Sequence, residues 1–235
     1  MTIETITSVL FDLVFIGSIV AIIWFVRRGL RGGDDYWRQF AEARGYRLTV
    51  QHGPRSQNRP EPVAELETIM PVMQYKSLAM LRPRLIEGMV NGRQFALMEL
   101  NPTWQRWFFD ALRPRGLAVA PSFIFGVRVE VRTMLLSVLV MPLAGSKFSY
   151  FYPTLPQGYV TAGQWQGHSV WAADKATATW ALERLSRVQL PDAEETQQWS
   201  ILTTGQAVWL LMPWRPQLES FVDAAGAIAA ALDAV

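Results

Sequence analysis

Residues 84–100 read RLIEGMVNGRQFALMEL, and this stretch carries the clearest fold signal in the chain. Asn91 and Gly92 separate two segments that are rich in apolar residues. An Asn-Gly pair readily takes the positive φ angles that both central positions of a tight two-residue turn require. The stretch therefore predicts a β-hairpin whose turn lies at residues 91 and 92.

The sequence on either side of this hairpin predicts further strands. In 123–133, apolar residues alternate with Arg128, Glu130 and Arg132, which is typical of a strand with one wet face. The continuous apolar run 134–141 predicts a fully buried strand. The other expected strands are 46–51, a pair around Gly167-His168, and a hairpin of 199–203 with 206–212 across Thr204-Gly205.

Helical spacing appears in the stretches 35–45, 102–112, 175–188 and from Pro216 to about Ala234. Asp174 is a favourable N-cap for the third of these helices, and we expect Trp180, Leu182 and Leu185 to face a core. Tight turns, rather than helical crossovers, join consecutive strands. We therefore expect antiparallel pairing and a single α+β domain over 35–235, with a weaker internal boundary near 145–158.

The apolar excess of the chain is concentrated before this domain. Residues 9–26 read VLFDLVFIGSIVAIIWFV, with Asp12 as the one charged residue. Counted from Ile6 to Val26, the segment forms roughly 31 Å of helix, which matches a hydrocarbon core of about 30 Å. Trp24 lies where an interfacial aromatic belongs. We expect a transmembrane helix over 6–27, then a hinge over 28–34.

Three arginines that follow this segment set its expected orientation, and they are Arg27, Arg28 and Arg31. By the positive-inside rule, the N-terminal side lies outside and the α+β domain lies in the cytoplasm, as in a single-pass protein. A cleaved signal peptide would instead carry its positive charge before the apolar stretch, where this chain has no Lys or Arg. A buried core helix is the other alternative, and the lack of a polar stripe in 13–26 disfavours it.

Composition and motifs exclude several classes of chemistry. The chain has no Cys and two His, which removes disulfides, thiolate nucleophiles and cysteine-held metal centres. A net charge of +2 excludes a bulk polyanion binder, so we expect no nucleic acid partner. No glycine-rich nucleotide loop, zinc-protease motif or serine-hydrolase elbow occurs. We therefore expect no catalytic residue, no cofactor, no metal and no obvious small-molecule substrate.

Two further groups of residues, one around His168 and one around Glu65, also predict no catalytic or metal site. His168 and Ser169 are neighbours on one expected strand, so their side chains point to opposite faces and cannot form a triad. A turn histidine bonded to backbone is the better interpretation of His168. Glu61, Glu65 and Glu67 lie on a loop and a short helix start, where acidic side chains are usually solvated.

The aromatic-rich helix 102–112 is the strongest candidate interface with a partner or with lipid. It combines three aromatic residues on one face with three flanking arginines: Trp104, Trp107 and Phe108, and Arg106, Arg113 and Arg115. This composition is typical of an interfacial helix, while packing in the core is the alternative.

These observations favour an accessory or assembly subunit that is anchored in the lipid bilayer and docked on a larger membrane protein complex. The absence of a catalytic motif and the near-neutral net charge of +2 support this class. Two alternatives stay open. One is an enzyme that acts at the membrane surface, and the other is a tethered module that binds a lipid or a peptide.

Overall fold

A computed structural model describes residues 14–21, 35–50, 61–62, 65, 84–100, 124–143, 155–191, 198–212 and 217–233. The chain divides into two compact units, Met1–Arg44 and Gly45–Val235.

Residues 14–21, in the first unit, are helical, and every one of them is exposed. Phe15 is 58% exposed and Val20 is 59% exposed. The Ser18 hydroxyl donates a hydrogen bond to the Val14 carbonyl at 2.8 Å, so this polar group is satisfied inside the helix. Within the described ranges, no helix combines the length and the apolar character that a bilayer crossing needs.

Most of the span expected over 6–27 lies outside the described residues, and so does the whole of the hinge expected over 28–34. The expected span and its orientation therefore stay predictions.

The helix expected over 35–45 is confirmed at 35–44. Its Trp37, Phe40 and Ala41 are buried, Trp37 completely. These residues lie three and four positions apart, so they share one face of the helix. Asp35 and Arg38 are exposed and form an ion pair at 3.3 Å. The helix is therefore amphipathic, as its sequence spacing indicates.

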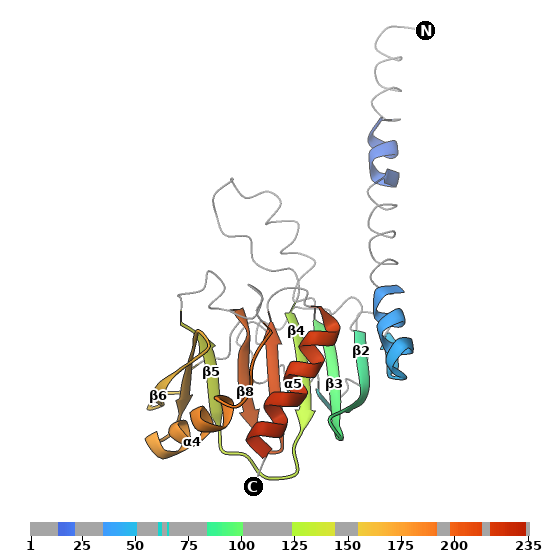
Figure 1. The fold of residues 1–235 in the computed structure, drawn as a ribbon. Coiled ribbons are helices and arrows are strands. Elements are labelled where there is room, and N and C mark those ends of the chain that lie inside the picture. Colours follow the sequence, from blue (N-terminus) through green and yellow to red (C-terminus); the bar gives the residue numbers. More distant parts are fainter. Residues whose placement is uncertain are drawn as a thin grey trace, which may run out of the picture. The chain divides into compact units, whose positions relative to one another are not determined.

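The second unit is built on an antiparallel sheet that has nine strands within the described residues (Figure 1). In chain order they are β1 (Arg47–Val50), β2 (Arg84–Val90), β3 (Arg93–Leu100), β4 (Ile124–Glu130), β5 (Val138–Pro142), β6 (Val160–Trp165), β7 (His168–Ala172), β8 (Ser200–Thr204) and β9 (Ala207–Met212). Their order in space is β1-β2-β3-β4-β9-β8-β5-β7-β6. With helices α4 (Lys175–Leu185) and α5 (Leu218–Asp233), this sheet confirms the α+β body.

Tight turns join the strands of three hairpins. The β2–β3 turn has φ angles of +50° at Asn91 and +71° at Gly92, as the sequence predicts. The β6–β7 turn lies at Gln166 and Gly167. The β8–β9 turn lies one residue later than expected, at Gly205 and Gln206, because the first turn position needs a positive φ and Gly205 supplies +56°.

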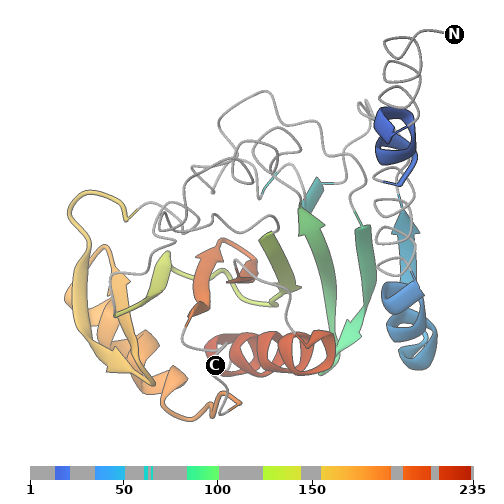
Figure 2. The ribbon, with the colours of Figure 1, turned by 90° about the horizontal axis from the view of Figure 1, so that it is seen from above.

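Helices α4 and α5 cover the same face of the sheet (Figures 1 and 2). Helix α5 packs on β2, β4 and β9, while α4 packs on β6 and β7. Phe125, Val127 and Val129 on β4 point to this helix-covered face and are fully buried. Arg128 alternates with them and points to the second face of the sheet.

Helix α4 begins as predicted but turns a different side to the core. The Asp174 carboxylate accepts a hydrogen bond from the Thr177 N–H at 2.8 Å, which makes Asp174 the N-cap. The buried side consists of Thr177, Ala178, Ala181 and Leu185. Trp180 and Leu182 are half-buried, so the expectation that they face the core is wrong in part. Three of the four residues on the buried side are therefore small: Thr177, Ala178 and Ala181.

The expected buried strand 134–141 is also wrong in part. Strand β5 begins at Val138, and Val138, Leu139 and Val140 are fully buried. Met134 is 80% exposed and Leu136 is 59% exposed. The connection that carries them runs past the β8–β9 turn instead of pairing along a strand, and it leaves these two side chains outside the core.

Gly88 on β2 should not tolerate a side chain. A Cβ at this position would lie 2.3 Å from Cδ1 of Tyr46, whose ring packs edge-on against Phe95. We expect Gly88→Ala to lower the free energy of unfolding by about 1–3 kcal/mol, the usual cost of overpacking. Urea unfolding of the purified full chain in mild detergent measures this loss. In a Tyr46→Ala background the same change should cost much less, and an equal cost would contradict the clash.

Candidate functional site

The membrane-anchor and interface residues expected from the sequence lie outside the described residues: Trp24, Arg27, Arg28, Arg31, Trp104, Arg106, Trp107, Phe108, Arg113 and Arg115. The structure therefore leaves these ten assignments as predictions. Within the described ranges, two carboxylates accept hydrogen bonds from several elements of the fold, and they form two clusters on opposite faces of the sheet.

The first is the Glu65 cluster, which consists of Glu65, Arg128, Thr204 and Trp209. The Arg128 Nε donates to Glu65 Oε2 at 2.7 Å, and the Trp209 indole N–H donates to Glu65 Oε1 at 2.9 Å. The Thr204 hydroxyl also donates to Oε1. Arg128 and Trp209 are directly opposite each other on β4 and β9. One carboxylate thus joins the segment between β1 and β2 to three central strands.

Both ionic groups of the Glu65 cluster are held in their charged forms. Burial alone would raise the pKa of Glu65, but hydrogen bonds from Thr204, Trp209 and Arg128 outweigh it and lower the pKa. Burial alone would lower the pKa of Arg128, and its bonds to Glu65 and Glu130 reverse that effect and raise it. A general acid or base needs a pKa near the working pH. The cluster is therefore suited to holding segments together and not to proton transfer.

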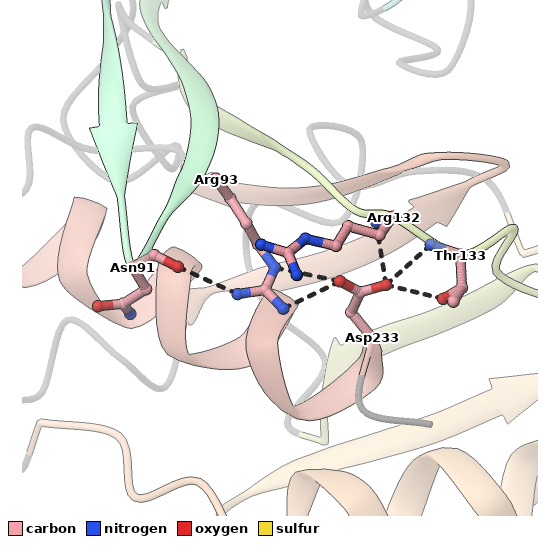
Figure 3. Close-up of polar contacts among 5 residues, drawn as sticks. All are labelled: Asn91, Arg93, Arg132, Thr133 and Asp233. Carbon is pink, nitrogen blue, oxygen red and sulfur yellow. Dashed lines mark hydrogen bonds and ion pairs between the residues drawn. The ribbon is translucent and has the colours of Figure 1, made fainter.

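The second is the Asp233 cluster, which consists of Asp233, Arg93, Arg132 and Thr133 (Figure 3). Asp233 Oδ1 accepts hydrogen bonds from the backbone N–H groups of Arg132 at 3.0 Å and Thr133 at 2.9 Å, and from the Thr133 hydroxyl at 2.8 Å. Asp233 Oδ2 accepts from an Arg93 Nη at 2.9 Å. Another Arg93 Nη donates to the Asn91 carbonyl at 3.2 Å. Asp233 therefore ties α5 to the β2–β3 hairpin and to the β4–β5 connection.

Asp233 lies at the C-terminal end of α5, where the helix dipole disfavours a negative charge. Its side chain is only 2% exposed. Burial alone would raise its pKa, but hydrogen bonds from Thr133, Arg132 and Arg93 outweigh burial and lower the pKa to about 2. The carboxylate is therefore ionised at neutral pH and stabilises the fold in that form.

Two further polar features have structural explanations. Arg84 and Glu99 lie directly opposite each other on β2 and β3 and form a buried ion pair. The buried ring of His168 lies with its Nδ1 3.0 Å from the Gln166 carbonyl, which confirms the expectation of a turn histidine bonded to backbone. In the described part of the chain, no group of three or more His, Asp or Glu side chains could hold a metal ion.

Sequence reasoning did not identify either cluster. The sequence-based interpretation of Glu65 as a solvated acid is wrong, because Glu65 is half-buried and accepts hydrogen bonds from three donors. Asp233 carried a usable signal, because it follows the uncharged run 224–232 at the end of an apolar helix, where a buried charge needs a partner. Its partners, Arg93 and Thr133, lie 140 and 100 residues away in the sequence.

No family model matches the chain, and no curated protein matches its sequence. Among solved structures, the crystal structure of the mycobacterial trehalose monomycolate transport factor A, TtfA, is similar to it with a TM-score of 0.49 and 10% sequence identity. That similarity covers 83% of this chain and 91% of the TtfA chain. At this TM-score and sequence identity, the similarity assigns no role to any residue of this chain.

Replacing Asp233 with Asn should destabilise the protein in a pH-dependent way. Because the pKa falls from 3.8 to about 2 on folding, the ionised carboxylate adds about 2 kcal/mol of stability above pH 4 or so. That contribution is lost as the pH falls through the folded-state pKa. Urea unfolding should therefore show Asp233→Asn less stable at pH 7, with the difference from wild type shrinking toward pH 2.

Glu183→Gln, which removes an exposed carboxylate from α4, is the matched control and should change stability by less than about 0.5 kcal/mol. A constant difference between wild type and Asp233→Asn from pH 7 to pH 2 would contradict the assigned role of the Asp233 charge.

Proposed function

We propose that this protein is a single-pass, membrane-anchored accessory subunit whose α+β body docks on a larger membrane protein complex. The observation that carries this proposal is the helix at 14–21, in which Val14, Phe15 and Ile16 are exposed by 58–67%. Exposed apolar side chains on consecutive positions cover more than one side of a helix, and such a helix is stable in hydrocarbon rather than in water. In the sequence, the apolar run 9–26 continues on both sides of these residues.

The orientation in this proposal rests on Arg27, Arg28 and Arg31, which follow the apolar run directly. Arginines within about 15–20 residues of a span are retained on the cytoplasmic side. The body then lies at the cytoplasmic membrane surface, where a partner in the same bilayer is close by. A tether of this kind raises the effective concentration of the body at the partner, so that a modest interface suffices.

A binding role is supported over catalysis by the electrostatics of the described residues. The carboxylates of Glu65 and Asp233 both have lowered pKa values, and each carries several hydrogen bonds that favour the ionised form. Catalytic acids and bases are usually shifted toward neutral pH instead. A membrane-surface enzyme stays the alternative, and turnover of a lipid substrate by the purified chain would favour it.

Replacing Arg27, Arg28 and Arg31 by Glu should weaken or invert the orientation of the span. We expect the wild-type chain to stay in membranes during alkaline carbonate extraction, with an N-terminal reporter on the outside. In the triple variant, a larger share of reporters should be cytoplasmic. Conversion of the same positions to Lys is the control and should preserve orientation. Release of the wild-type chain by carbonate would contradict the anchor.

The helix expected over 102–112 gives the second test. If Trp104 and Trp107 contact a partner, the double change to Ala should leave a folded, membrane-inserted chain that loses its co-purifying partners. Interface aromatics of this kind often contribute 2 kcal/mol or more, roughly a 30-fold loss of affinity. If they are core residues, the change should cost about 3–5 kcal/mol of folding stability and reduce accumulation of the chain.

A further inference from the structure

The β4–β5 connection, residues 131–137, is held in one conformation by hydrogen bonds along its length. The Val131 N–H donates to the Gln206 carbonyl at 2.9 Å, and the Leu135 N–H donates to the Gly205 carbonyl at 2.7 Å. Asp233 accepts from the N–H groups of the two residues after Val131. The connection is therefore fixed to the β8–β9 turn on one side and to the end of α5 on the other.

The end of the connection that leads into β5 is fixed as well. The Thr203 hydroxyl donates to the Leu136 carbonyl at 2.5 Å and accepts from the Val138 N–H at 2.7 Å. The Tyr159 hydroxyl donates to the Ser137 hydroxyl at 2.6 Å. A segment bonded at so many backbone positions loses little further conformational entropy when something binds to it.

This rigid segment presents two large apolar side chains outward. Met134 and Leu136 are 80% and 59% exposed, while Leu135 between them points inward and is 7% exposed. Outside the helix at 14–21, these two are the most exposed large apolar side chains among the described residues. Leu135 and Val131, each 7% exposed, anchor the connection to the core, whereas Met134 and Leu136 lie mostly outside it.

An exposed arginine precedes this apolar pair on the same connection, since Arg132 lies two residues before Met134. Arg93, Arg132 and Asp233 belong to one cluster, and the Asp233 carboxylate pairs with Arg93 and with backbone N–H groups. Within the described part of the chain, the exposed Arg132 guanidinium forms no ion pair. The cluster therefore keeps a net charge of about +1, which attracts a carboxylate on an incoming molecule.

We propose that Met134, Leu136 and Arg132 form a docking surface for a protein segment that presents an apolar face and a carboxylate. Met and Arg are enriched at the cores of protein interfaces, and an arginine can bind a carboxylate through two parallel hydrogen bonds. A second copy of this chain fits less well, because it would place the same positive charge against Arg132. A lipid surface would not need the backbone of this connection to be fixed.

This inference rests on the proposed function, according to which the partner is a protein of the same membrane. The experiment uses the full chain in native membranes with a photoreactive phenylalanine analogue at position 134. The same analogue at position 183, an exposed site on α4, is the control. Irradiated products are separated by mass, and cross-linked peptides are sequenced by mass spectrometry.

We expect an adduct with another protein from position 134 and none from position 183, and the captured segment should contain Asp or Glu beside apolar residues. Arg132→Glu should reduce the adduct at least fivefold, Arg132→Lys should largely keep it, and converting the captured acid to Lys should restore it with Arg132→Glu. Leu136→Ser should also reduce it. Unchanged urea unfolding of each variant excludes misfolding as the cause.

An adduct with lipid alone, an adduct with a second copy, no adduct, or an adduct unaffected by Arg132→Glu would each overturn the docking surface. Carbonate extraction of the same samples separates the two proposals. A chain retained in membranes without the adduct contradicts only this inference, whereas a chain released from membranes contradicts the anchor.

Discussion

The pairing of β4 with β9 is the constraint on which the rest of the body depends. Strands β1 to β4 come from the part of the chain before residue 131, and strands β5 to β9 come from the part after it. The ladder from Phe125–Met212 to Glu130–Ala207 is the junction between these two sets in the sheet. Val127, Val129, Val208 and Leu210 on this ladder are fully buried, so its hydrogen bonds are protected from water.

The two ionic clusters join segments of the body on opposite faces of the sheet. On one face, Glu65 accepts hydrogen bonds from β4, β8 and β9 together. On the helix-covered face, Asp233 joins α5 to β3 and to the β4–β5 connection. A buried charge adds little net stability over an apolar residue, but leaving its partner unpaired is costly. The clusters therefore raise the free energy of other arrangements of these segments more than they lower the free energy of this one.

The same arrangement explains how a chain without catalytic motifs can present a specific surface. Asp233 fixes the backbone of residues 132 and 133, and this leaves the Arg132 side chain and the neighbouring Met134 outside. A group that stabilises the fold thus also fixes the backbone of the docking surface that we propose. The exposed apolar helix at 14–21 is a different kind of surface, since its side chains suit lipid rather than one defined partner.

Local rules in the sequence determined the elements of the body. Asn91-Gly92 specified the first hairpin, Asp174 the start of α4, and alternation in 124–130 the strand β4, because turn angles, capping and side-chain period depend on near neighbours. Only the tertiary structure decided that β4 pairs with β9, that Met134 and Leu136 lie outside, and that Glu65 and Asp233 have buried partners. Those contacts join residues 63 to 144 positions apart, and no local pattern encodes which distant strand or donor will lie opposite a given side chain.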